Sequence, residues 1–418
     1  MSVPAGPSVI GLKRSFGFGD RLGLATPGHI SALGGHGFAP YFAQQSIREM
    51  SRTGRTPEEV MRDAAQAIEK ERWAGEWGSD ADHLQTREDV FRTAAAGFTM
   101  FTIDPSVHVV NRAAEMGPEE LERAAASVAE SSGTPLEDVL GLYLGKAHEI
   151  GDGEVLTFKE RTDLIRGFVK YYGALVFARQ MHGWIAEACA GRPFEVELSV
   201  DETLVPTSPL EHLFVGLELK RLGVGIVSLA PRFIGDFEKG IDYKGDLKVF
   251  ESHYRRHALI ASYCGPYKLS IHSGSDKFSI YPIAGRLSGE LLHVKTAGTS
   301  YLEALRVVCR AAPGLFAEIA AFCRGRYEKD RASYHVSASL SGIPERIEAK
   351  DMEKHYLDTD CGRQIMHVTF GSVLLQGKDS KGASFRELLL DCLRRQDSLY
   401  REVLQKHLGR HLRCLSQG

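Results

Sequence analysis

Short apolar runs alternate along this chain with longer stretches in which apolar residues recur every three or four positions. The runs predict β-strands, and the longer stretches predict helices. Repeated strand-then-helix order favours a parallel sheet covered by helices, and eight such units favour a closed (β/α)8 TIM barrel. The eight predicted strands are residues 15–22, 76–80, 98–104, 195–201, 225–230, 268–273, 291–296 and 334–339.

Two regions exceed what a plain barrel needs. The connection from about 105 to 193 is too long for one crossover helix, so we predict a helical insertion after the third strand, placed at the barrel mouth as a lid or an oligomer contact. Residues 384–415 space their Leu and Val for one apolar face and predict extra C-terminal helices. Because no repeat, low-complexity tract or clear linker interrupts the chain, we predict a single domain over residues 1–418.

Alternation along the strands predicts which side chains face the barrel interior, since the other face of each strand meets the helices. On this basis Glu197, Lys295 and His335 point inward. Burying such groups is costly unless they are paired or bind a cation. Those nearest the carboxyl ends of the strands are the site candidates: Asp80, Asp82, His83, Asp104, Asp201, His272 and Lys295.

Ordinary structural roles remain open for several of these residues. The neighbouring Asp82 and His83 could form a surface pair, and His272 could be a hydrogen-bonded core residue. Lys295 could pair with an inward carboxylate such as Glu197, or it could hold an anionic substrate. A site is favoured only if separate strands bring these groups together.

Two further motifs point away from other functions. His253 and His257 are one helical turn apart, as zinc ligands can be, but the two arginines between them favour a solvated helix face. The glycines of residues 17–23 follow the spacing GxGxxxG rather than GxGxxG, which argues against a nicotinamide cofactor.

Composition narrows the class of partner. The chain has 418 residues, 43% of them hydrophobic, and a net charge of −3 with both signs interspersed. This balance does not favour nucleic acid or a membrane surface, and no apolar run approaches a membrane span. The 7 cysteines are scattered without a CxxC pair, and the start lacks a signal-peptide pattern, so we predict reduced thiols and a cytoplasmic protein. A homo-oligomer is left open.

The motifs SFGFGDRLGLATPGHI, GSDADHL, AAGFTMFTID, VELSVDET, LAPRFIGDFEKGIDYKGD and LSIHSGSDKFSIYP together resemble the tagaturonate/fructuronate epimerase family. The resemblance extends from about Ser15 to about Leu340. More distantly, Asp82-His83, the Glu-x-Glu-Leu-Ser run and the segment beginning at His272 are similar to motifs of the metal-dependent (class II) ketose-bisphosphate aldolases. That similarity implies a TIM barrel that uses a divalent cation.

Carried to this chain, the resemblance makes Asp82 the proton acceptor and His83 and His272 metal ligands. Glu197 or Asp201 falls where the aldolases keep a functional acid. The aldolases supply a further His ligand where this chain has none between residues 231 and 240. Glu238, ahead of Asp236, is the predicted third ligand, because zinc and manganese accept oxygen ligands. The implied cofactor is a divalent cation, zinc first, with manganese, nickel or cobalt as alternatives.

The resemblance implies a metal-dependent epimerase that interconverts D-tagaturonate and D-fructuronate. The inverted carbon lies β to the ketone, so its C–H is not acidified, and we predict retro-aldol cleavage followed by re-addition. Asp82 would take the hydroxyl proton, and Glu197 or Asp201, with a pKa raised by burial, would return one. The predicted substrate-binding residues are Lys295, Arg232, Lys277 and Asp104.

Three alternatives stay open. A neutral ketose would make the protein a tagatose/fructose 4-epimerase, and a phosphorylated ketose would make it a class II aldolase. The unclear third ligand also allows a non-catalytic, aldolase-like accessory subunit, which need not hold a metal.

Overall fold

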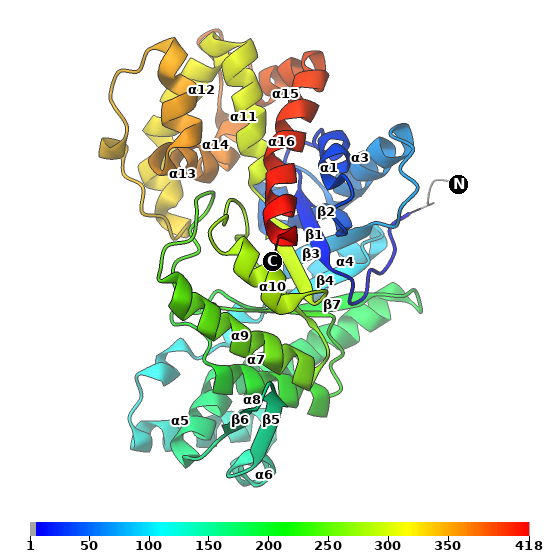
Figure 1. Cartoon of the computed structure of the whole chain (residues 1–418), viewed down its shortest axis with the longest axis vertical. Helices are drawn as coiled ribbons and strands as arrows, with labels where there is room; N and C mark the ends of the chain where they lie inside the picture. The colour runs from blue at the N-terminus through cyan, green and yellow to red at the C-terminus, as the bar shows by residue number, and fades with distance from the viewer. Residues whose placement is uncertain (1–5, 418) are drawn as a thin grey trace.

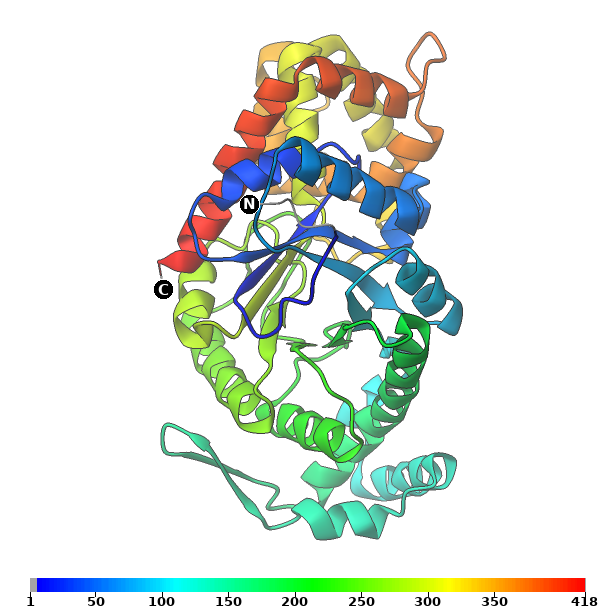
Figure 2. The same cartoon turned by 90° about the vertical axis from the view of Figure 1, so that its right-hand side faces the viewer.

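A closed barrel of parallel strands forms the centre of the computed structural model, which describes residues 6–417. The strands follow one another around the barrel in the order β1-β10-β9-β8-β7-β4-β3-β2, and helices surround them (Figure 2). The predicted (β/α)8 TIM barrel is therefore confirmed. The barrel strands are β1 (Ser15–Gly19), β2 (Ala39–Ser46), β3 (Gly78–Leu84), β4 (Met100–Ile103), β7 (Glu195–Val200), β8 (Ser228–Pro231), β9 (Lys268–Ile271) and β10 (Leu292–Thr296).

The outer layer consists of helices that follow the strands. Two of them begin with a capping box: Thr56 and Ser208 accept hydrogen bonds from the backbone N–H of Glu59 and Glu211, whose carboxylates accept the cap N–H in return. Each capping box satisfies backbone donors that would otherwise lack partners. The helices of this layer are α1 (Thr26–Leu33), α2 (Ile47–Thr53), α3 (Pro57–Lys70), α4 (Arg87–Ala95), α7 (Arg161–Cys189), α8 (Pro209–Arg221), α9 (Leu247–Cys264), α10 (Tyr281–Ser288) and α16 (Asp397–Ser416).

A second group of helices stands above the barrel in Figure 1 and has its own apolar core, which includes Leu305, Phe316 and Ile365. After this group the chain returns through α16, which packs against α1, α10 and α11. The C-terminal helices predicted over residues 384–415 are thus present. The elements of the group are α11 (Thr299–Ala311), α12 (Pro313–Asp330), η3 (Arg331–Ser333), η4 (Leu340–Gly342), η5 (Ala349–Asp351), η6 (Lys354–Asp358), α13 (Asp360–Val368), α14 (Phe370–Gln376) and α15 (Phe385–Arg395).

The insertion lies at the opposite end of the molecule, at the bottom of Figure 1. It follows β4, the fourth strand along the chain, rather than the third as predicted, because the sequence prediction missed β2. It also contains an antiparallel hairpin, which extends away from the barrel in Figure 2. Its elements before α7 are η1 (Ser106–His108), η2 (Asn111–Ala114), α5 (Pro118–Ser132), α6 (Leu136–Tyr143), β5 (Ala147–Gly151) and β6 (Glu154–Thr157).

Two strand predictions were wrong. β2 was missed because its second half, Gln44, Gln45 and Ser46, is polar although all three side chains are buried. Residues 334–339 alternate like a strand but form an irregular segment between η3 and η4. Consequently His335 does not face the barrel interior; its side chain is 72% exposed and lies near Asp236.

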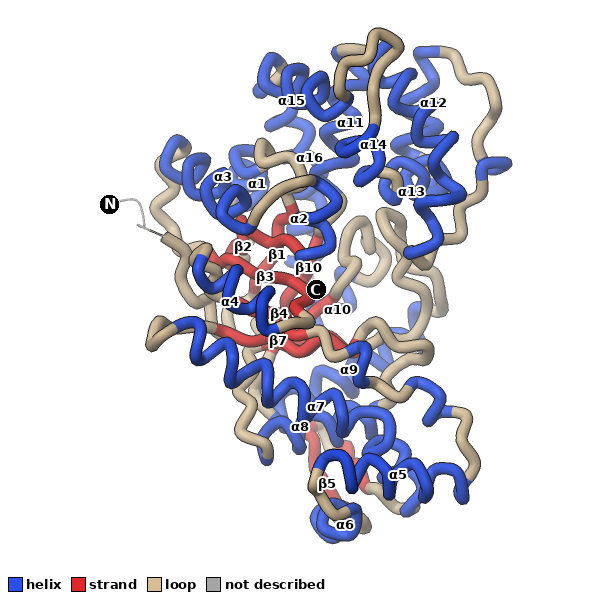
Figure 3. The backbone as a smooth tube through the Cα atoms, turned by 180° about the vertical axis from the view of Figure 1, so that it is seen from behind, coloured by secondary structure: helices blue, strands red, loops and turns tan. Residues whose placement is uncertain are grey.

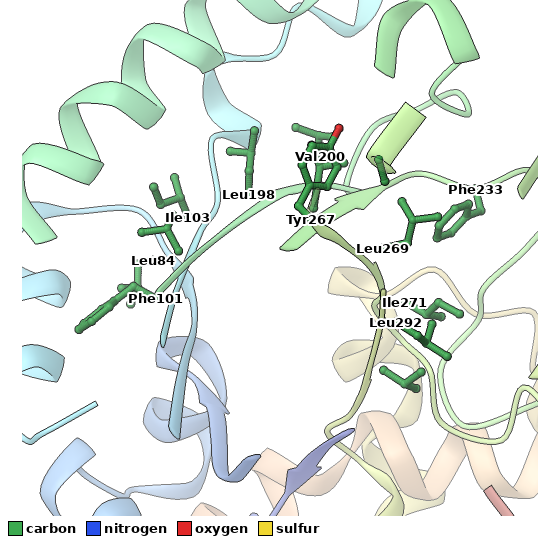
Figure 4. Close-up of a cluster of buried hydrophobic side chains, with 14 of the residues drawn as sticks. Leu84, Phe101, Ile103, Leu198, Val200, Phe233, Tyr267, Leu269, Ile271 and Leu292 are labelled. Carbon is green, nitrogen blue, oxygen red and sulfur yellow. The ribbon is translucent and has the colours of Figure 1, made fainter. Parts of the chain in front are cut away.

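Alternation is confirmed on the other strands. Val196, Leu198 and Val200 join the main apolar core, and Figure 4 shows Leu198 and Leu269 on the helix side of their strands. The intervening Glu197 is fully buried inside the barrel. Among residues 6–417, no helix is long and apolar enough to span a membrane. Whether the chain is one domain stays a prediction.

Candidate active site

The main cavity opens at the carboxyl ends of the barrel strands, where TIM-barrel enzymes carry their active sites. Its two adjoining parts share the wall residues Asp201, Lys239, His272 and Tyr334. The loops that follow the strands lie between α9 and α13 beside the barrel (Figure 3). Tyr334 comes from the irregular segment after η3, so the upper helical group also contributes to the cavity wall.

Three predicted residues meet at this cavity. Asp82, His83 and His272 each offer a ligand atom, and these atoms lie within 4.8 Å of one another. The two imidazole centroids are 5.1 Å apart, although the residues belong to different parts of the barrel. His83 has a φ of 58°, a left-handed conformation that is unusual for a residue other than glycine and clusters at functional sites. The predicted convergence of these three side chains is confirmed.

Each histidine uses one ring nitrogen to contact a carboxylate and turns the other toward Asp201. His83 Nδ1 lies 2.8 Å from Asp82 Oδ1, and His272 Nε2 lies 2.6 Å from Glu197 Oε1. On the other side, Asp201 Oδ1 lies 3.3 Å from His272 Nδ1 and 4.0 Å from His83 Nε2. A carboxylate behind each imidazole is the arrangement typical of metal-bound histidines.

One further observation indicates that these side chains fit a divalent cation. His272 Nδ1 is buried and, among the described residues, has no hydrogen-bond partner of good geometry. A buried polar atom of this kind is costly unless a ligand satisfies it. Two imidazoles and a carboxylate oxygen are ligands that zinc and related cations accept.

Lys295 lies in a cluster of three buried carboxylates, two of which also contact the histidines. Its Nζ is 2.7 Å from Asp80, 2.8 Å from Asp82 and 2.7 Å from Glu197. Burial alone would lower the pKa of Lys295, but the three acids outweigh burial and raise it well above its ordinary value. Of the two roles left open for Lys295, pairing with inward carboxylates is the one the structure shows.

The carboxylates of this cluster and the neighbouring Asp201 differ in their pKa values. Burial raises the pKa of Asp80 to about 6, although Lys295 opposes the shift. For Glu197, Lys295 and His272 outweigh the effect of burial and hold its pKa well below the ordinary value. For Asp201, His272 likewise outweighs burial and lowers the pKa. The raised pKa expected for Glu197 or Asp201 is therefore not found.

Three other predicted site residues make separate contacts. The Glu238 carboxylate accepts hydrogen bonds from Ser337 Oγ at 2.7 Å and from Gln364 Nε2 at 2.6 Å. Lys277 Nζ donates to the carbonyl oxygen of Glu238 at 2.8 Å, and Asp104 accepts from Gln85 at 2.8 Å. Neither Glu238, Lys277 nor Asp104 joins the histidine centre in the described part of the chain. Arg232, in contrast, lines the cavity.

A second group of possible ligands was not predicted. Asp276, His407 and His411 also offer atoms within 4.8 Å of one another, but they join the loop after β9 to α16. Asp276 Oδ2 is held by Arg363 Nη2 at 2.6 Å. No spacing in the sequence links residue 276 to residues more than a hundred positions away, so only the folded chain reveals the group.

The solvated face predicted for His253 and His257 is also wrong. His257 is fully buried, with its Nδ1 2.7 Å from Nδ1 of His212. The prediction failed because Arg255 and Arg256 point to Glu154 of the β5–β6 hairpin, on another side of α9.

Taken together, the fold and the site define the class: a TIM-barrel protein with a histidine–carboxylate centre at the carboxyl ends of its strands. A family model described as "UxaE: tagaturonate epimerase" matches residues 3–415, and the chain therefore belongs to the tagaturonate epimerase family. The predicted family resemblance is confirmed.

This chain is similar to a named relative and to proteins of solved structure. It is 45% identical over 410 residues to the tagaturonate/fructuronate epimerase of Thermotoga maritima, covering 98% of this chain and 82% of the relative. The glycerol-complexed crystal structure of fructuronate-tagaturonate epimerase UxaE from Cohnella laeviribosi is 38% identical with a TM-score of 0.92, covering 98% of this chain and 83% of that chain. The native structure of the same protein is 39% identical with a TM-score of 0.91 and the same coverage.

Proposed function

We propose that this protein is a divalent-metal-dependent epimerase that interconverts D-tagaturonate and D-fructuronate. Family membership and the activity of the 45% identical tagaturonate/fructuronate epimerase support the substrate pair. One structural observation carries the metal dependence: His83 Nε2 and His272 Nδ1 both face Asp201 Oδ1, and a carboxylate backs each ring.

His83, His272 and Asp201 would hold the cation. Asp201 replaces Glu238 as the proposed third ligand, because Asp201 lies 3.3 Å from His272 whereas the carboxylate of Glu238 is already satisfied by Ser337 and Gln364. When bound, the cation supplies Lewis-acid polarisation of the substrate ketone. Zinc is the first choice for two imidazoles and a carboxylate, and manganese, nickel and cobalt accept the same donors.

Asp82 would accept the proton that starts the reaction. Its carboxylate lines the cavity, and Lys295 and His83 outweigh burial to lower its pKa, so it stays ionised. The substrate hydroxyl on the β-carbon loses its proton to Asp82 while the bond between the α- and β-carbons breaks. This cleavage leaves an aldehyde fragment and the enolate of the ketone fragment.

Asp82 would also return the proton. After the aldehyde turns, the bond forms again on its other face, and the new alkoxide takes the proton back from Asp82. Atoms and charge therefore balance without another acid. We assign this step to Asp82 rather than to Glu197 or Asp201, because Glu197 is fully buried under His272 and Asp201 faces both imidazoles.

The substrate carboxylate requires a cation that is not already neutralised. Lys295 is surrounded by three acids, and the Lys277 ammonium is taken up by backbone carbonyl oxygens. Arg232 lines the cavity and forms no ion pair with the described residues, so we keep Arg232 from the predicted set as the carboxylate contact.

The proposal is tested by incubating the purified chain with tagaturonate, with and without a strong chelator, and following fructuronate by NMR. Turnover that stops with chelator and returns with added zinc or manganese is expected. Full turnover without metal would eliminate the cation from the proposal. Running the reaction in D2O distinguishes the two mechanisms, because retro-aldol cleavage leaves hydrogen on the inverted carbon, whereas direct C–H exchange introduces deuterium there.

A further inference from the structure

Cations around the main cavity differ in whether a carboxylate neutralises them. Arg21 pairs with Glu49 at 2.7 Å, and Arg48 pairs with Glu202 at 3.1 Å. Lys239, which lies in the motif LAPRFIGDFEKGIDYKGD but was not among the predicted site residues, lines both parts of the cavity and forms no ion pair within residues 6–417. Arg232 shares this property on the wall of the larger part. An ammonium or guanidinium left without an anion in a partly buried wall favours an anionic ligand.

Lys239 is held in place beside the histidine centre. It belongs to the loop after β8, and its Nζ donates to Ser273 Oγ at 2.6 Å. Ser273 directly follows His272 and has a φ of 52°, which turns the chain sharply after the imidazole. The Lys239 ammonium is therefore fixed near His272 and keeps two of its three N–H donors for another partner.

Arg232 is fixed on the same wall by different contacts. Its Nη1 donates to the backbone carbonyl of Thr203 at 2.8 Å, and its backbone N–H donates to Thr207 Oγ1 at 3.1 Å. Its Nε is buried and has no hydrogen-bond partner among the described residues. A carboxylate oxygen of a ligand would satisfy a guanidinium N–H of this kind.

We propose that Lys239 and Arg232 form a two-cation subsite for the carboxylate of the sugar acid, and that Lys239 is the residue that selects the acid over a neutral ketose. This inference rests on the proposed function for the identity of the sugar. Its chemistry, the binding of a short hydroxy-carboxylate, is independent of turnover.

The subsite also gives the retro-aldol step a fixed pivot. The aldehyde fragment of a keto-hexuronate has three carbons and carries the carboxylate at the end opposite the aldehyde. A carboxylate held by Lys239, next to His272, keeps this fragment bound while the aldehyde carbon turns. A neutral fragment lacks this anchor and escapes more readily.

The test compares two probes with the same three-carbon skeleton, D-glycerate and glycerol, by calorimetry on the metal-loaded protein. Wild type is expected to bind glycerate more tightly than glycerol, and Lys239→Met to reduce the glycerate affinity by about tenfold to a hundredfold, as for loss of a charged hydrogen bond. Glycerol affinity should not change. Lys239→Arg should restore part of the difference. Lys248→Met, which removes one exposed charge at the start of α9, is the matched control and should behave as wild type.

Kinetics separate this inference from the proposed function. Lys239→Met should raise KM for tagaturonate and lower kcat, while leaving any turnover of neutral tagatose as in wild type. If the chain does not epimerise tagaturonate but its glycerate binding depends on Lys239, the proposed function fails and the subsite stands. If tagaturonate turnover is normal in Lys239→Met, or wild type binds glycerate no better than glycerol, the subsite is overturned.

Discussion

Two clusters in this molecule each contain one aspartate and two histidines at similar distances but differ in their surroundings. Asp82, His83 and His272 lie at the cavity, whereas Asp276, His407 and His411 join α16 to the loop after β9. We call these the cavity cluster and the latch cluster. Both contain one carboxylate and two imidazoles with ligand atoms within 4.8 Å of one another, so composition and distance do not separate them.

What separates the two clusters is whether a ring nitrogen is left without a partner. In the latch cluster, His411 Nε2 accepts the backbone N–H of Asp276 at 3.0 Å, and Arg363 donates to the Asp276 carboxylate at 2.6 Å. Burial lowers the pKa of His411 to about 4, which keeps it neutral and able to accept. In the cavity cluster, His272 Nδ1 has no hydrogen bond of good geometry in the described chain, and its nearest carboxylate oxygen, on Asp201, lies 3.3 Å away. This poorly satisfied nitrogen, rather than the residue types, favours the cavity cluster as the proposed metal site.

The largest effect is expected when one imidazole is removed from each cluster, which tests whether the two clusters differ in metal binding. His272→Ala should lose the bound metal and lower kcat/KM by more than about a hundredfold, beyond the loss that changing an outer partner causes. His411→Ala should keep metal and activity but cost about 1–3 kcal/mol of stability, because Asp276 loses a buried partner. Metal analysis, the epimerase assay and thermal unfolding measure the three effects. Equal metal loss in both variants would show that the clusters do not differ as described.

Much of the barrel was predictable because its strands alternate so regularly. Glu197 lies between two apolar residues that face the helices, and its inward direction follows from that spacing alone. β2 could not be recognised, because Gln44 and Gln45 are polar yet buried. Their side chains form hydrogen bonds with residues elsewhere in the chain; Gln44, for example, donates to Asp82 at 3.2 Å. Because residues 44–46 are polar at consecutive positions, neither an apolar run nor an alternating pattern marks this half of the strand.

The sequence predicted the residues of the candidate site only where they lie at or just after the ends of strands. Asp82 and His83 end one strand and His272 follows another, and parallel strands bring such positions to one end of a barrel. Lys239 lies on a loop whose path depends on packing against the upper helices, and no periodicity marks it. Glu238 was a reasonable ligand by residue type, but its contact with Ser337, 99 positions away, is set by tertiary structure.

A smaller effect is expected from changing a carboxylate that lies outside each cluster but contacts one of its imidazoles. Glu197→Gln should weaken metal affinity by about tenfold to a hundredfold, because Glu197 orients His272 through a 2.6 Å hydrogen bond. Glu303→Gln is the matched change in the latch cluster, where Glu303 Oε1 lies 3.5 Å from His407 Nδ1. It should leave metal affinity unchanged. Competition with a calibrated chelator measures both affinities, and a similar loss in Glu303→Gln would contradict the assignment.

The smallest expected effect is the pH dependence of the latch cluster. Burial opposes ionisation of both partners, but Arg363 and His407 hold the pKa of Asp276 well below 3.8, and Glu303 and Asp276 raise the pKa of His407 above 6.5. A lowered acid stabilises the fold above its ordinary pKa and loses that contribution as pH falls. A raised histidine stabilises the fold below 6.5 and loses its contribution as pH rises through the raised value.

The cluster should therefore stabilise the fold most between about pH 4 and pH 6.5. We expect the melting temperature of His407→Gln to fall below wild type by about 2 °C at pH 6, and the gap to narrow toward pH 9 as the pH rises through the raised pKa of His407. Arg363 stays charged across this range, and His411 is already neutral, so neither masks the change. Parallel thermal scans of the two proteins measure the gap, and a gap that widens toward pH 9 would mean that His407 is neutral in the folded chain.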